Sequence, residues 1–98
     1  MSESIPPSNG GRFTLKLGAE EEEAVIYGAE LAGPDATHTS DARVERTTGK
    51  VSWAEEAPES LLWLQKYATA ALRAAHRSRE SAGWPRRLTR WRNAPGRS

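Results

Sequence analysis

The sequence predicts an α+β fold, a four-stranded antiparallel meander followed by one long amphipathic helix and a short basic C-terminal helix. Three observations point to it. Apolar and polar residues alternate over much of the first half, which is typical of half-buried strands. After Pro58 the apolar spacing changes to three and four residues, which is typical of a helix facing a core. With 98 residues and no cysteine, one domain without disulfides or thiolate metal sites is expected.

The first two strands are predicted from alternation. Residues 12–17 place phenylalanine and two leucines on one face, and residues 24–32 repeat the pattern before Gly33-Pro34-Asp35 ends it. Four consecutive glutamates, residues 20–23, lie between them. Side chains of an extended run point in alternate directions and do not converge on one cation, so this run is interpreted as a solvated acidic loop.

A hairpin is predicted next. Residues 36–40 have the composition of a loop, and residues 41–46 and 50–54 alternate again on either side of Thr48-Gly49. Glycine supplies the positive φ that a tight turn needs. Four strands with short connections predict an antiparallel meander.

The long helix is predicted to begin at Pro58, because a proline at the first helical position loses no intrahelical hydrogen bond. Gly83 is expected to end it. The residues expected to face the sheet are spaced by three and four: Leu61, Leu64, Ala68, Leu72 and Ala75.

A second, short helix is predicted after Gly83, because Trp84, Leu88 and Trp91 follow the spacing i, i+4, i+7. The predicted domain therefore spans residues 12–92. Residues 1–11, rich in proline, glycine and serine, are expected to be a disordered leader, and residues 93–98 a disordered tail.

Charge is distributed unevenly along the chain. Residues 1–60 hold 12 acidic and 5 basic residues, a net charge of −7, whereas residues 61–98 hold 9 basic residues and only Glu80 as an acid, a net charge of +8. The overall charge of +1 hides this separation. Such a distribution orients a charged partner toward the C-terminal third.

No constellation for catalysis is found, so the chain is not expected to be an enzyme, and no cofactor or metal is expected. His38 and His76 have no histidine or cysteine neighbour at metal-ligand spacing and are expected to be surface residues. Thr48-Gly49-Lys50 lacks the first glycine and the hydroxyl residue of a phosphate-binding loop. The first residues do not form a secretory signal, and the apolar run at residues 61–64 is too short to span a bilayer, so a cytoplasmic protein is expected.

The aromatic residues of the C-terminal third favour a protein-binding role, because tryptophan and tyrosine are enriched at interface hot spots. The chain is accordingly predicted to be a small non-catalytic subunit or adaptor of a larger assembly, with another protein as its partner. The candidate contact residues are Trp63, Tyr67, Trp84 and Trp91. Trp63 and Tyr67 could instead widen the core face of the helix, and Trp84 and Trp91 could dock on the domain.

Binding to nucleic acid is the alternative prediction. Arginine neutralises phosphates, and tryptophan can stack on exposed bases. The candidate face covers residues 73–92, with the arginines Arg86, Arg87, Arg90 and Arg92. Attachment to a membrane surface ranks last, because three large apolar residues bury too little area for a firm anchor.

Overall fold

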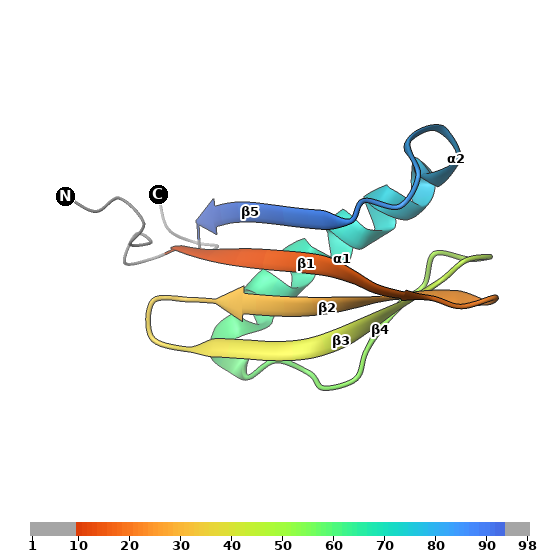
Figure 1. Cartoon of the computed structure of the whole chain (residues 1–98). Helices are drawn as coiled ribbons and strands as arrows, with labels where there is room; N and C mark the ends of the chain where they lie inside the picture. The colour runs from red at the N-terminus through yellow and green to blue at the C-terminus, as the bar shows by residue number, and fades with distance from the viewer. Residues whose placement is uncertain (1–9, 94–98) are drawn as a thin grey trace.

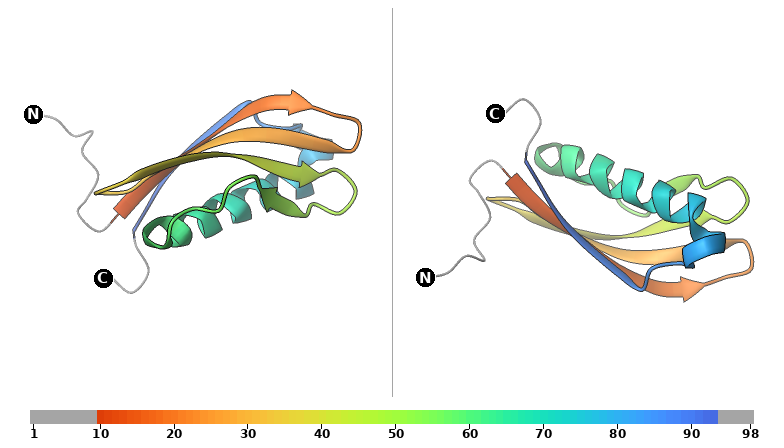
Figure 2. Two further views of the ribbon diagram at one scale, coloured as in Figure 1. Left: turned by 90° about the horizontal axis from the view of Figure 1, so that it is seen from below. Right: turned by 90° about the horizontal axis from the view of Figure 1, so that it is seen from above.

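The computed structural model describes residues 10–93 as two layers, an antiparallel sheet and a helical layer against one of its faces (Figure 1, Figure 2). In chain order the elements are β1 (Gly10–Glu20), β2 (Ala24–Ala32), β3 (Thr37–Glu45), β4 (Val51–Trp53), a 3-10 turn (Glu59–Leu61), α1 (Leu62–Arg77), α2 (Arg79–Ala82) and β5 (Arg87–Asn93). The strand order across the sheet is β4-β3-β2-β1-β5, and every neighbouring pair is antiparallel.

The predicted meander is confirmed, since the first four strands pair in the order in which they follow one another. The sheet has a fifth strand, however, because β5 returns after the helix and pairs with β1 over residues 10–16. β1 therefore lies inside the sheet, and β5 forms an edge of it (Figure 1).

The prediction of a short basic C-terminal helix is wrong. Residues 87–93 form β5 instead, and the register pairs Leu88 with Leu15 and Trp91 with Arg12. The physical reason is tertiary, because without β5 the backbone groups along one side of β1 would have no strand partner. The spacing of Trp84, Leu88 and Trp91 suggested one helical face. In the fold, Trp84 precedes β5 and packs on the core, Leu88 packs on the core from β5, and Trp91 lies on the other face of β5.

Strand boundaries also differ from the prediction at several places, and β1 continues past Leu17 to Glu20. β1 begins at Gly10, two residues before the expected start of the domain, and the expected loop at residues 36–40 belongs mostly to β3. The β3 pattern was missed because Thr37, Thr39 and Asp41 are all exposed, so no apolar alternation marks them. The rest of the expected leader, and the expected tail apart from Asn93, lie outside the described residues.

The core lies between the sheet and α1. Phe13, Leu15, Tyr27 and Leu31 project from the sheet onto one face, and every residue of the predicted helical stripe is buried against them. The helical segment begins directly after Pro58, as expected, but it is interrupted at Ser78. Gly83, which has φ 77°, ends α2 and lets the chain turn back toward β5.

Candidate functional site

The four aromatic candidates lie in three different places. Trp63 and Tyr67 lie together on α1, Trp84 is half-buried against the core, and Trp91 lies on the face of the sheet that α1 does not cover. They therefore do not form one continuous patch. Only Tyr67 and Trp91 among the described residues are large apolar side chains in the exposed class, with exposed fractions of 38% and 44%.

Trp63 and Tyr67 form an edge-to-face pair one helical turn apart. Their ring centres are 6.2 Å apart with an interplanar angle of 88°, which is a favourable geometry for two aromatic rings. Trp63 is also tied down at its polar end, since its Nε1–H donates to the carbonyl of Ser60 at 3.1 Å. With Leu62, Lys66 and Ala70 the two rings line a shallow hollow of about 470 Å³, which we call the aromatic patch.

A groove of about 380 Å³ separates α1 from β5. Its apolar lining comes mainly from small side chains, Ala71, Ala74 and Ala75 on α1, with Leu88 on β5. Arg90 and Arg92 of β5 also line it. We call it the alanine groove, and its small side chains leave room for a larger apolar side chain from outside.

Arg92 connects the aromatic patch with the alanine groove. Its guanidinium carbon lies 5.5 Å from the centre of the Tyr67 ring, within the range of a cation–π contact. The same side chain lines the groove. The patch and the groove are therefore neighbours on one side of the molecule, and an extended partner could contact both.

Several basic residues of α1 and β5 have no ion-pair partner within residues 10–93. Within residues 10–93, no carboxylate lies within 4.0 Å of the charged nitrogens of Lys66, Arg73, Arg77, Arg90 or Arg92. α1 itself contains no acidic residue. The two ion pairs of the described residues lie near the β1–β2 turn instead. The positive charges of Lys66, Arg90 and Arg92 are therefore not balanced by a neighbouring carboxylate of the described residues.

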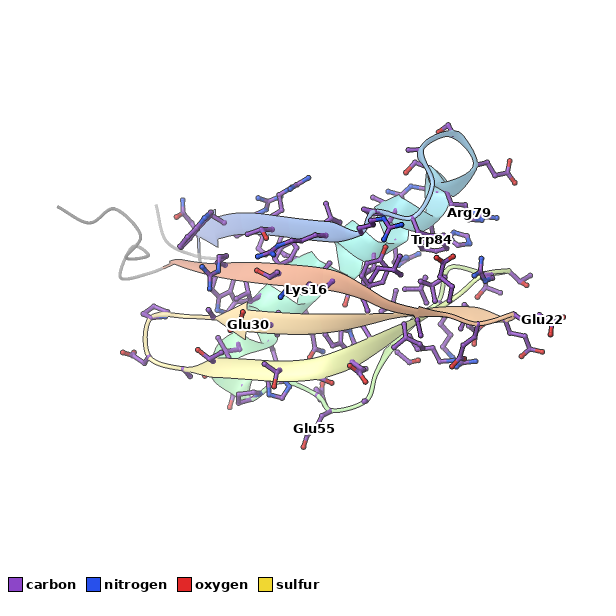
Figure 3. The ribbon with its side chains drawn as sticks, in the orientation of Figure 1. Lys16, Glu22, Glu30, Glu55, Arg79 and Trp84 are labelled. Atoms are coloured by element: carbon purple, nitrogen blue, oxygen red, sulfur yellow. The ribbon has the colours of Figure 1, made fainter. Side chains whose placement is uncertain are left out.

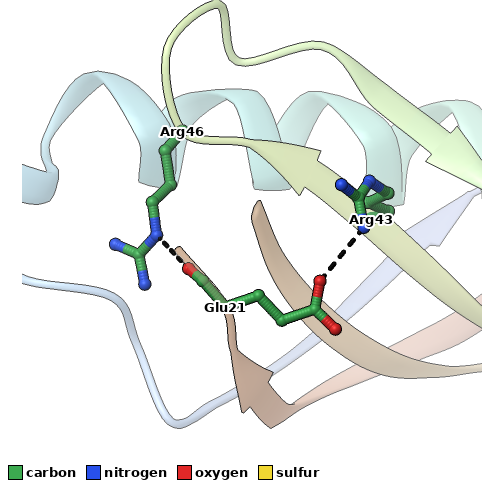
Figure 4. Close-up of polar contacts among 3 residues, drawn as sticks. All are labelled: Glu21, Arg43 and Arg46. Atoms are coloured by element: carbon green, nitrogen blue, oxygen red, sulfur yellow. Dashed lines mark hydrogen bonds and ion pairs between the residues drawn. The ribbon is translucent and has the colours of Figure 1, made fainter. Parts of the chain in front are cut away.

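The acidic turn between β1 and β2 is held by arginines of the neighbouring strand. Glu21 pairs with Arg43 at 3.2 Å, its backbone carbonyl accepts a hydrogen bond from Arg46 Nε at 2.7 Å, and Arg46 also reaches Glu20 at 3.5 Å (Figure 4). These pairs are solvent-exposed and each contributes less than about 1 kcal/mol. The four glutamates, residues 20–23, form the acidic tip of the β1–β2 hairpin, and Glu22 lies at its end (Figure 3).

Trp84 serves the fold. Its ring centre is 6.5 Å from Tyr27 and 6.2 Å from His76, and the Tyr27 hydroxyl donates to the carbonyl of Pro85 (Figure 3 labels Trp84). Burial raises the pKa of Tyr27 from 10.0 to about 12, and the negative charge of Glu20 adds to the rise. The Trp84-Pro85 segment is thereby fixed at the point where the chain enters β5.

His76 is only half-exposed, unlike the surface residue expected. Its Nε2–H donates to the carbonyl of Arg46 at 2.8 Å, which ties α1 to the β3–β4 turn. His38 lies on β3, and its Nε2–H donates to the carbonyl of Glu55 at 3.1 Å. Both histidines therefore hold backbone segments in place.

The four candidate arginines do not share a face. Arg86 precedes β5, and the period of two along the strand places Arg87 on the uncovered face of the sheet, with Arg90 and Arg92 on the helix side. The uncovered face adds two cations that sequence reasoning missed, Arg12 and Lys16 of β1. Their alternation with buried Phe13 and Leu15 was the available signal.

Among residues 10–93 no group of three histidine, aspartate or glutamate side chains is placed to hold a metal ion. A hollow of about 640 Å³ is an open depression over the sheet near Gly28. No helix of the described part of the chain is long and apolar enough to cross a membrane.

Comparison with protein-family models, with curated proteins and with solved structures finds no match to this chain. Function is therefore argued from the surfaces above.

Proposed function

We propose that this chain is a non-catalytic docking module, a subunit or adaptor that binds another protein through the aromatic patch and the alanine groove. The observation that carries the proposal is the pair of half-buried Trp63 and exposed Tyr67 beside a groove lined by Arg90 and Arg92, which have no ion-pair partner among the described residues. Exposed aromatic anchors of this kind dominate binding energy in many interfaces.

The partner's chemistry follows from the charges. Lys66 lines the aromatic patch, and Arg90 and Arg92 line the alanine groove, so a complementary segment carries aspartate or glutamate side chains. At least one large apolar side chain of the partner fills the alanine groove, whose own side chains are small. The proposed partner is thus an acidic segment with apolar anchors.

Selection from a random peptide library displayed on phage tests the proposal without knowledge of the natural partner. The immobilised full-length protein is expected to enrich peptides that combine acidic residues with leucine or an aromatic residue. For a selected peptide made synthetically, the double substitution Trp63→Ala and Tyr67→Ala is expected to weaken binding at least about tenfold, as for a hot-spot pair.

Trp91→Ala is the matched control, because it removes an aromatic ring of similar exposure from the uncovered face of the sheet. Arg90→Gln with Arg92→Gln tests the charge requirement separately. Selected peptides without acidic enrichment, or equal binding by the Trp63/Tyr67 variant and the wild type, would contradict the proposal.

A further inference from the structure

One face of the sheet is covered by no element of residues 10–93. Figure 2 shows α1 and α2 on one side only, and no described element packs against the other side. This open face turns toward the viewer in Figure 3, where Lys16 and Glu30 are labelled on it. Most of its residues are polar or small, and its larger apolar side chains are the half-buried Ile26 and the exposed Trp91.

Cations and an aromatic ring gather on the β1/β5 half of the open face. The register pairs Arg12 with Trp91, Thr14 with Thr89 and Lys16 with Arg87, so three cross-strand pairs follow one another along the two strands. We call these six residues the basic platform. An exposed indole is thus separated from two cations by a pair of hydroxyl groups, whose oxygens are 3.4 Å apart.

We propose that the basic platform binds single-stranded nucleic acid, with a base stacked on Trp91 and phosphates against Arg12, Lys16 and Arg87. Single strands suit such a surface because their bases are free to stack on an aromatic ring. The platform spans five residues of β5, from Arg87 to Trp91, and its four rises of ~3.3 Å make about 13 Å. That length accommodates two to four nucleotides.

The geometry around Trp91 supports stacking. The indole is 44% exposed, and the guanidinium carbon of Arg12 lies 5.5 Å from its ring centre. A base on the indole therefore has a cation beside it for its own phosphate. None of the three cations lies within 4.0 Å of a carboxylate among the described residues, so no ion pair has to be broken first.

Acidic residues on the other half of the open face orient the strand. Glu30 and Asp41 line the depression over Gly28, next to Lys16 and Thr14. They repel phosphates, which keeps the nucleic-acid backbone over β1 and β5 and turns base edges toward β2 and β3. Carboxylates accept hydrogen bonds from the exocyclic amino group of cytosine, whereas thymine has no amino group and offers only its single ring N3–H. A preference for cytosine over thymine follows.

Fluorescence anisotropy with short labelled oligonucleotides tests the proposal. The wild-type protein is expected to bind oligo(dC) more tightly than oligo(dT) or a duplex of the same length. Three phosphate contacts give a slope of about −2 for the logarithm of affinity against the logarithm of salt concentration. Trp91→Ala is expected to weaken binding by about 5-fold to 100-fold, and Trp91→Phe is expected to retain much of the affinity.

Charge removal on the two sides of the molecule provides the matched comparison. Lys16→Gln with Arg87→Gln is expected to weaken binding and flatten the salt slope, whereas Arg73→Gln with Arg77→Gln on α1 removes the same charge and is expected to change neither. Circular dichroism of each variant confirms that it is folded.

Four results would overturn the proposal: no binding even at low salt, a duplex or oligo(dT) bound as tightly as oligo(dC), equal loss in both double variants, or an acidic peptide that binds at Trp91 and displaces the oligonucleotide. The first three do not bear on the aromatic patch, which lies on the helix side, and for the fourth the Trp63→Ala, Tyr67→Ala variant shows whether the peptide also uses that patch. A failure here is therefore distinguishable from a failure of the proposed protein-docking function.

Discussion

The Tyr27 side chain both fills the core and donates a hydrogen bond. Its ring is fully buried between the sheet and Trp84, and its hydroxyl donates to the carbonyl of Pro85 at the entry to β5. Tyr27→Phe keeps the ring and removes the donor. We expect a loss of about 1 kcal/mol in unfolding free energy, measured by urea denaturation at neutral pH. An unchanged midpoint would mean that the hydrogen bond does not hold the segment.

The raised pKa of Tyr27 makes stability depend on alkaline pH. The folded state keeps the proton up to about pH 12, whereas the unfolded chain releases it near pH 10.0. The contribution of the neutral hydroxyl is therefore complete below pH 10 and is lost as pH rises toward 12, by roughly 3 kcal/mol at most. Urea denaturation between pH 9 and 12 measures this loss, and Tyr27→Phe is expected to remove much of it. The same slope in both proteins would refute the assignment.

Gly49 shows which sequence signals at the residue scale were reliable. The turn at Thr48-Gly49 was predicted because a tight turn needs a positive φ, and Gly49 has φ 78°. The sequence could not show that the turn docks on α1, where a Cβ at residue 49 would lie 2.6 Å from His76 Nδ1. The need for glycine at residue 11 could not be predicted for a similar reason. The Leu64 and Trp63 side chains that would crowd a Cβ there reach it only through tertiary packing.

Gly49→Ala is expected to destabilise the protein by about 1–3 kcal/mol, because it combines a strained φ with a clash at His76. Thermal unfolding followed by circular dichroism measures the loss. Gly83→Ala is the matched control, because it has the same positive φ but nothing within 4 Å of an added Cβ. Equal losses in the two variants would remove the packing contribution.

At the scale of elements, strands with buried alternation and the long helix were predictable, whereas β5 was not. Four arginines in residues 86–92 obscure the period of two, and Trp84 and Trp91 mimic a helical period through an accidental spacing. What makes residues 87–93 a strand is the row of backbone groups on the side of β1 away from β2. These groups lie more than 70 positions away in the sequence, as the pairing of Thr14 with Thr89 shows. Local sequence carries no signal for such a partner.

The register of β5 predicts that proline is tolerated at Thr89 but not at the neighbouring Arg90. Leu17 N–H donates to the carbonyl of Arg86, so alternate residues of β5, including Arg90, direct their backbone groups toward β1, while Thr89 directs its groups to the free edge. Arg90→Pro removes a ladder hydrogen bond, and Thr89→Pro does not. We expect Arg90→Pro to lose about 1–3 kcal/mol more in urea denaturation. The reverse order would contradict the register.

At the scale of the whole molecule, the charge separation along the sequence becomes a separation across the sheet. β5 forms a basic edge, whereas the acidic Asp41 of β3 and Glu55 after β4 lie toward the opposite edge, together with Arg43 of β3 (Figure 3 labels Glu55). The sequence predicted the separation, but it could not divide the arginines between two surfaces, because that division depends on the period of two along β5.

The placement of β5 also explains why only two of the four aromatic candidates, Trp63 and Tyr67, lie together as the sequence predicted. Trp63 and Tyr67 were found because helical spacing places them together, whereas Trp84 and Trp91 were grouped with them on the assumption of a second helix. In the fold, Trp84 supports the core and Trp91 belongs to the basic platform. The molecule thus has two candidate binding surfaces, one on each side of the sheet.

The most direct test of protein docking on the helix side is amide chemical-shift mapping of the isotope-labelled protein with a selected acidic peptide. The account predicts the largest shifts in α1 from Leu62 to Arg77 and in Leu88, Arg90 and Arg92 of β5, with little change in β2 and β3. Shifts confined to the open face, around Lys16, Glu30 and Asp41, would contradict docking on the aromatic patch and the alanine groove.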